Sequence, residues 1–211
     1  MHILELTHQM YADMPVFPGT PQPSFIPVHT IQVDKVSQME IRTYSHMGTH
    51  IDAPFHMVKD GKKLDDFPIT QFIGSACLID CSKNEGLEIP KSFLEEYEEK
   101  IRQVDFVILY TGWSQYWGTP KFFEPYPCLS EEAAKWLASF TLKGIGLDTC
   151  SVDQIDETYF KIHYALFDNE FLIIENLANL DTIEKDIFEF SALPLKIANA
   201  DGCPVRAFAR Y

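Results

Sequence analysis

The sequence predicts a single mixed α/β (α+β) domain over residues 1–211, with a central mixed β-sheet or barrel-like β core flanked by a few helices. Its 211 residues fit one domain and are few for two. Hydrophobic residues make up 46% and charged residues 23%, both near globular averages, which excludes wholesale disorder. Strand-like segments outnumber helical ones, which favours this class over a doubly wound parallel sheet.

The strand-like segments are short apolar runs, rich in β-branched and aromatic residues, with proline, glycine or polar residues at their ends. They follow a proline-rich loop at 14–21, where each proline fixes its own φ and restricts the residue before it. We predict strands at 25–33, 39–44, 76–80, 104–111, 144–148, 171–175, 195–199 and 205–210.

Two segments have helix signals. Residues 91–103 carry Ser92 near their start and acidic residues after it. Residues 130–140 begin with Ser130 as a candidate N-cap, and two glutamates follow at the positive end of the helix dipole. Both segments are therefore predicted to be helices.

The charge balance bears on partners and location. Seventeen basic against 31 acidic residues give a formal charge of −14, which repels nucleic acid and anionic membrane surfaces. Neither a signal peptide nor an apolar run of membrane-spanning length is visible. We expect a cytoplasmic protein that acts on a small molecule, with no nucleic acid or membrane partner.

The cysteines are odd in number and scattered, and their spacing matches no zinc finger. Two of them are four residues apart on one predicted strand, and therefore on one of its faces. We expect reduced, mostly buried thiols at Cys77, Cys81, Cys128, Cys150 and Cys203.

The segment 45–56 concentrates three of the seven histidines and an aspartate. Because a glycine and a proline interrupt it, we expect extended or turning backbone, on which His50 and Asp52 point to the same face. His46 joins them if the chain turns at Gly48. Two imidazoles and a carboxylate suit zinc, manganese or iron and leave coordination positions open. The alternative is a polar loop whose histidines cap backbone groups.

The same residues carry a family resemblance. The segment resembles the HxGTHxDAPxH signature of the cyclase-like metal-dependent hydrolases, which include bacterial kynurenine formamidase and isatin hydrolase. Further similar blocks lie at 17–19, 146–148 and 193–207, so the resemblance covers most of the chain. It implies a swivelling β/β/α fold. The matching residues are His46-x-Gly48-Thr49-His50-x-Asp52-Ala53-Pro54-x-His56.

The resemblance also implies metal ligands. A first metal would take His46, His50 and Asp52, and a second would share Asp52 and add His163 and Glu175. The implied cofactor is a divalent transition metal, Zn or Mn, with one or two ions per chain. Spacing alone leaves open that Glu175 is a solvated strand end and His163 a surface residue.

His56, the last residue of the motif, is implied as the general acid/base. A neutral imidazole can take a proton from the nucleophile and return it to a leaving amine near neutral pH. An additional ligand and an orienting residue remain alternatives. The implied reaction is hydrolysis of an amide carbon–nitrogen bond by metal-activated water, in an aryl formamide or a cyclic amide.

Aromatic residues are candidates for substrate binding, because an aryl group favours an aromatic wall. We consider Phe17, Trp113, Tyr116 and Trp117, although most aromatic residues of any chain fill its core. The residue after Gly19 departs from the formamidase pattern, in which an aspartate is common there. Pocket residues set substrate choice, so the substrate stays open.

The resemblance implies a homodimer or a dimer-based oligomer, in which the early loop reaches the neighbouring subunit's site. Two alternatives to the amidohydrolase remain: a metal-binding protein of the same fold without turnover, and a cyclase or lactonase on a related carbonyl substrate. A structural metal is a further alternative, although three ligands with open positions favour catalysis over a closed structural site.

Overall fold

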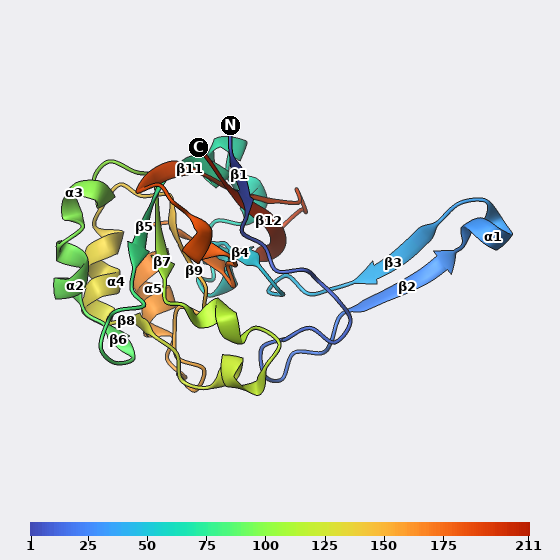
Figure 1. The fold of residues 1–211 in the computed structure, drawn as a ribbon, viewed down its shortest axis with the longest axis horizontal. Helices are drawn as coiled ribbons and strands as arrows, with labels where there is room; N and C mark the ends of the chain where they lie inside the picture. The colour runs from blue at the N-terminus through green and yellow to red at the C-terminus, as the bar shows by residue number, and fades with distance from the viewer.

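The computed structural model describes residues 1–211, which form a closed β-barrel, a layer of helices on one side and a projecting two-stranded arm (Figure 1). The predicted mixed class with few helices is confirmed. The barrel strands follow each other around the ring in the order β12 (Gly202–Arg210), β11 (Ile187–Pro194), β5 (Ile73–Asp80), β7 (Phe106–Tyr110), β9 (Gly144–Leu147), β10 (Leu172–Glu175) and β4 (His50–Asp52).

The last strand closes the barrel. The start of β12 pairs with β4, with Gly202 opposite Asp52, and the rest of β12 pairs with β11. The strands β5, β7, β9 and β10 are parallel to one another, whereas β4, β11 and β12 pair antiparallel with their neighbours. A short strand, β1 (Ile3–Glu5), adds to the far end of β12. Closure leaves few free strand edges. The sheet is mixed, as the sequence predicted.

Alternation along the strands separates two cores. In β7, Phe106 and Ile108 face the barrel interior, whereas Val107 and Leu109 face the helices. Strand β9 lies so close to its neighbours that a Cβ at Gly146 would come within 2.7 Å of Ile108 Cδ1. The same alternation sends the side chains of Ile173 and Glu175 to the outer face, where the site lies.

The helices cover the outer face of the sheet. Ser130 caps α4 (Glu131–Ala138) by accepting a hydrogen bond from Ala133 N, as predicted. The single helix predicted at 91–103 is wrong in extent, because Tyr97 interrupts it between two short helices. Sequence analysis missed the helix that faces the site. The remaining helical segments are α2 (Lys91–Glu95), α3 (Glu98–Ile101), α5 (Lys161–Phe167), η1 (Pro54–His56), η2 (Leu64–Asp66), η3 (Ile69–Phe72), η4 (Trp113–Tyr116), η5 (Pro120–Phe123) and η6 (Leu180–Thr182).

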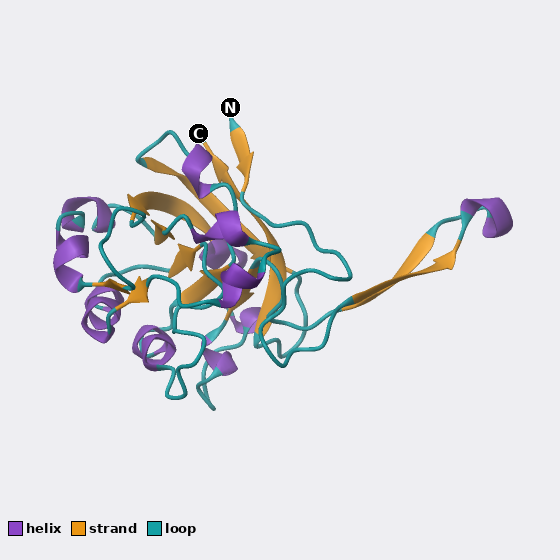
Figure 2. Cartoon of the chain, turned by 60° about the horizontal axis from the view of Figure 1, so that its bottom comes forward, coloured by secondary structure: helices purple, strands orange, loops and turns teal.

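The arm consists of β2 (Ser24–His29) and β3 (Gln38–Arg42), joined at the tip by α1 (Ile31–Asp34), and it stands away from the body (Figure 2). The strand predicted at 25–33 therefore ends early, where the tip turns. The strand predicted at 195–199 is wrong, because β11 ends at Pro194 and a loop leads to β12. A small pair, β6 (Glu88–Ile89) and β8 (Cys128–Leu129), completes the strands.

Two further predictions concern the whole chain. All five cysteines are free and buried, as expected. None of the helices combines the length and the apolar character needed to cross a lipid bilayer.

Candidate metal centre

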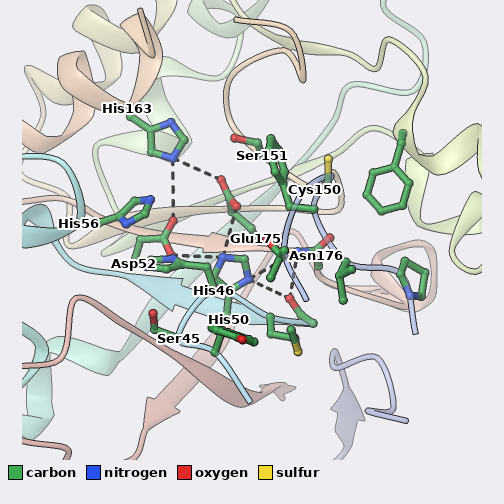
Figure 3. A pocket seen from close by; sticks show the side chains of 18 of the residues that line it. Ser45, His46, His50, Asp52, His56, Cys150, Ser151, His163, Glu175 and Asn176 are labelled. Atoms are coloured by element: carbon green, nitrogen blue, oxygen red, sulfur yellow. Dashed lines mark hydrogen bonds and ion pairs between the residues drawn. The ribbon is translucent and has the colours of Figure 1, made fainter. Parts of the chain in front are cut away.

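The candidate site lies where β4 and β10 run side by side on the outer face of the barrel. His50 and Glu175 are opposite each other in the pairing, so their side chains emerge from the same face. Helix α5 brings His163 over this face, and His46 reaches it from the loop before β4 (Figure 3). The loop turns at Gly48, which has φ +63°, a conformation that favours glycine. Extended backbone at His50 and Asp52 agrees with the expectation from the sequence.

Asp52 is the centre of a buried cluster of imidazoles and carboxylates. Its Oδ1 lies 2.6 Å from His46 Nδ1 and 3.3 Å from His50 Nε2. Its Oδ2 lies 3.9 Å from His163 Nε2. Glu175 closes the cluster, with its two oxygens 3.4 Å from His50 Nε2 and 3.6 Å from His163 Nε2. The structure thus brings together the five residues that were predicted as ligands.

Hydrogen bonds on the far side of each ring fix which nitrogen faces the cluster. His50 Nδ1 lies 2.8 Å from the carbonyl oxygen of Gly48, and His163 Nδ1 lies 2.6 Å from Asp153 Oδ2. When Nδ1 carries the proton and donates it to these acceptors, the Nε2 lone pair of each ring points at the cluster. Such an arrangement is typical of imidazoles that bind a metal.

Asp153 was not predicted, and it explains why α5 was missed. Its two carboxylate oxygens accept hydrogen bonds from the backbone N–H groups of Ile162 and His163, at 2.9 and 3.1 Å. The first turn of α5 is therefore satisfied by a residue well upstream instead of a local N-cap. A local search for capping residues could not detect this helix.

Burial and mutual charge shift the cluster's titration. Burial and the charge of Asp52 raise the pKa of Glu175 to about 8. Burial alone would raise the pKa of Asp52, but His46 and His50 hold it well below its ordinary value. Burial alone would lower the pKa of His46, but Asp52 and Asp201 raise it to about 10. When no other cation is present, the cluster therefore binds protons, which balance the charge of its carboxylates.

The donor set fits one divalent metal ion or two. The ligand atoms of His46, His50 and Asp52 lie within 4.8 Å of one another, and so do those of Asp52, His163 and Glu175. Both of these triads combine imidazole nitrogen with carboxylate oxygen, which suits zinc and manganese. A third group within the same distance, His46, His56 and Asp201, shares His46 with the first triad. A cation here would neutralise the two buried carboxylates, which have no lysine or arginine partner.

His56 lies at the edge of the cluster. Its ring centroid is 3.7 Å from that of His46, and its Nδ1 is 3.7 Å from Asp201 Oδ2. Burial lowers the pKa of His56 to about 4, so its imidazole is neutral near neutral pH. A neutral imidazole beside the cluster suits a proton acceptor.

Asp201 connects His56 to the cluster and was not predicted as a site residue. Its Oδ2 lies 2.9 Å from His46 Nε2, on the side of that ring opposite Asp52. The next residue, Gly202, leaves room for this ring, because a Cβ there would lie 2.5 Å from His46 Cε1. No spacing signal could identify Asp201, since β12 meets the motif only when the barrel closes.

Asn176 links the end of β10 to the loop before β4 by hydrogen bonds. Its side-chain Nδ2 donates to the carbonyl oxygen of Gly48 at 2.9 Å, and its backbone carbonyl oxygen accepts from Thr49 Oγ1 at 2.6 Å. The motif turn is thereby attached to the residue that follows Glu175. Sequence reasoning missed this link as well, because both of its partners lie more than a hundred residues away.

A cavity of about 420 Å³ opens over the cluster. Phe17 lines it, as predicted, but Trp113, Tyr116 and Trp117 do not. Trp113 points away from the cavity, because its indole N–H donates to the carbonyl oxygen of Phe122 at 3.0 Å. The aromatic wall is formed instead by Phe17, Tyr44, Phe122, Phe123 and Phe160.

The barrel and its outward-facing cluster of imidazoles and carboxylates define a protein with a candidate metal centre beneath a cavity, and the comparisons with known proteins assign its class. The family model described as Putative cyclase matches residues 4–154, which is more than half of the chain. The chain therefore belongs to this family, the cyclase-like metal-dependent hydrolases, and the predicted family is confirmed.

Individual relatives cover nearly the whole chain. A kynurenine formamidase of Bacillus cytotoxicus is 32% identical over 208 residues, which are 98% of this chain and 96% of that protein. A kynurenine formamidase of Bacillus cereus is 38% identical over 165 residues, covering 78% of this chain and 76% of that protein. Isatin hydrolase A from Labrenzia aggregata, solved with benzyl benzoate, is 26% identical with a TM-score of 0.89, covering 99% and 93% of the two chains.

Proposed function

We propose that this protein hydrolyses the carbon–nitrogen bond of an aryl formamide or a cyclic amide, as an arylformamidase-like amidohydrolase. The observation that carries this proposal is the pairing of a buried ligand cluster with a neutral histidine at the floor of one cavity. The relatives named kynurenine formamidase and isatin hydrolase support the class of bond. The products would be a carboxylate and an amine.

We assign His46, His50, Asp52, His163 and Glu175 to hold one or two ions of Zn or Mn. When bound, such a metal polarises a carbonyl and lowers the pKa of water. The chain's own contribution is orientation, because Asp153 and the Gly48 carbonyl fix the rings of His163 and His50.

His56 is proposed as the general acid/base. Its imidazole accepts the proton of the attacking water and then donates it to the nitrogen of the leaving amine. Asp201 lies 3.7 Å from His56 Nδ1, near enough to orient the ring toward the cavity. The aromatic wall, which includes Phe17, excludes water and holds the aryl group flat.

The test uses formanilide, with formate release as the measured product. Protein stripped with a chelator should be inactive, and Zn²⁺ or Mn²⁺ should restore turnover. Elemental analysis of protein purified without a chelator or a histidine tag gives the number of ions per chain. If loaded protein releases no formate and opens no cyclic amide, the hydrolase proposal fails and a binding protein without turnover remains.

We also propose that the protein forms a homodimer through the arm. The pairing of β2 with β3 puts Phe25 beside Ile41 and Pro27 beside Met39, so one face of the arm is apolar. Ile41 is 62% exposed and Met39 51% exposed. An isolated two-stranded ribbon is at best marginally stable in water, so we expect a second subunit to cover this face.

Light scattering on the intact chain and on a variant with residues 24–42 replaced by a short turn would test the dimer. We expect about twice the chain mass for the intact protein and the chain mass for the variant. An intact monomer would reject the proposal. We further propose a cytoplasmic location, which five free, buried cysteines support.

A further inference from the structure

Apart from the histidines of the metal centre, the cavity over the cluster has no positively charged side chain in its walls. No lysine or arginine lines it, and its uncharged polar groups include Ser45, Ser151 and Gln154. The histidines and carboxylates that line it belong to the metal centre, and the other ionisable groups in the lining are the Tyr44 hydroxyl and the Cys150 thiol. The walls therefore offer a ligand aromatic and neutral polar contacts.

The basic side chain that comes just before two wall residues is turned away from the cavity. Lys121 precedes the wall residues Phe122 and Phe123, but its Nζ lies 3.9 Å from the ring centroid of Tyr116 and 5.9 Å from that of Trp113. The ammonium group is thus held by aromatic faces outside the cavity.

The arm brings no net charge either. Lys35 and Arg42 are balanced by Asp34 and Glu40 within residues 24–42. A second copy that placed its whole arm near the cavity would add no net charge there. With a formal charge of −14, the chain as a whole repels anions.

We infer that the cavity selects substrates whose aryl portion is uncharged, and discriminates against those that carry a carboxylate on the ring. The inference rests on the proposed amide hydrolysis. A carboxylate in these walls would lose water without gaining a cationic partner, which costs binding free energy. A neutral aryl amide loses little and gains aromatic contact.

A matched pair of substrates tests this selectivity on the metal-loaded enzyme. 4-Formamidobenzamide and 4-formamidobenzoate have nearly the same shape and differ by one negative charge. We expect kcat/KM for the amide to exceed that for the carboxylate by about tenfold or more, which is a difference of about 1.4 kcal/mol. A carboxylate that lies unproductively on the metal lowers kcat and KM together and leaves kcat/KM unchanged. Equal values, or a preference for the carboxylate, would overturn the inference.

A positive charge placed in the cavity wall tests whether electrostatics cause the selectivity. Thr20 lines the cavity, is half-buried and has no side-chain hydrogen bond, so it offers a position for a longer side chain. Thr20→Arg should lower the ratio of the two kcat/KM values at least threefold, whereas Thr20→Gln, of similar length and no charge, should not. The same ratio in both variants would contradict the electrostatic explanation.

Calorimetry separates this inference from the proposed function. If neither formamide is hydrolysed, the proposed reaction fails for this substrate class. Binding of the corresponding amines, 4-aminobenzamide and 4-aminobenzoate, still reports the charge preference. Binding of 4-aminobenzamide at least ten times more tightly would support the selectivity, and tighter binding of 4-aminobenzoate would reject it.

Discussion

The two halves of the metal centre differ in how far their side chains are exposed to solvent. The side chains of His50, Asp52, His163 and Glu175 are at most 6% exposed. On the other side, His46 is 22%, His56 27% and Asp201 39% exposed. The first group forms a buried half and the second an open half, although both His46 and the buried four line the cavity.

This difference separates the ligands that are shielded from solvent from the histidine that we propose moves a proton. In the buried half, each imidazole has its second nitrogen hydrogen-bonded, to Asp153 or to the Gly48 carbonyl, so ring rotation and proton exchange are restricted. In the open half, the shortest ion-pair distance from His56 is 3.7 Å, to Asp201. A ring held this loosely can exchange protons with a ligand in the cavity.

The largest expected effect is in the buried half, at the residue shared by both triads. Asp52→Asn keeps the shape but removes the negative charge that both candidate metal positions use. We expect activity to fall more than about 10³-fold, because metal catalysis supplies several kcal/mol. Metal content, measured by elemental analysis, should fall as well. Full metal content with normal turnover would show that the buried half does not hold the metal.

The next effect is in the open half. His56→Ala should lower kcat by about 10²–10⁴-fold while metal content stays at the wild-type level. The matched His50→Ala variant should lose metal, which provides the contrast between the two halves. If His56→Ala also lost its metal, His56 would be a ligand and its role as the general acid/base would be wrong.

Asp201 should have a smaller effect, because it acts through other residues. We expect Asp201→Asn to lower kcat/KM about 10–100-fold and to shift the pH profile of kcat, since the amide cannot compensate the charge of His46 or His56. Asp201→Glu should restore part of the activity. A pH profile identical to the wild type would indicate a purely structural role.

The smallest effect concerns the stability of the metal-free protein. The pKa of Glu175 is raised to about 8 and that of His46 to about 10, so the folded state binds more protons than the unfolded state above pH 6.5. Stability should therefore fall as the pH rises from 6.5 to 8. Each kcal/mol lost should lower Tm by about 2–4 °C. Calorimetry should give a weaker dependence for Glu175→Gln and for metal-loaded protein, and a metal-free Tm that rises with pH would contradict the charge assignment.

The sequence was most informative where the chemistry is local. His46, His50, Asp52 and His56 lie within eleven residues, and two-residue alternation on extended backbone was enough to place His50 and Asp52 on one face. The helix at Ser130 was found because its cap is adjacent to it in the chain. The family resemblance implied His163 and Glu175, which spacing alone did not distinguish from surface residues.

The tertiary structure decided everything that depends on distant segments meeting. Asp153 caps α5 and orients His163 from outside that helix, and Asp201 reaches His46 only because β12 pairs with β4. The cavity wall is a similar case, since Trp113 and Phe122 are both aromatic and only packing determined which of them faces the ligand. Alternation and capping act between near neighbours and can be read from sequence, whereas barrel closure brings together residues that have no local relation.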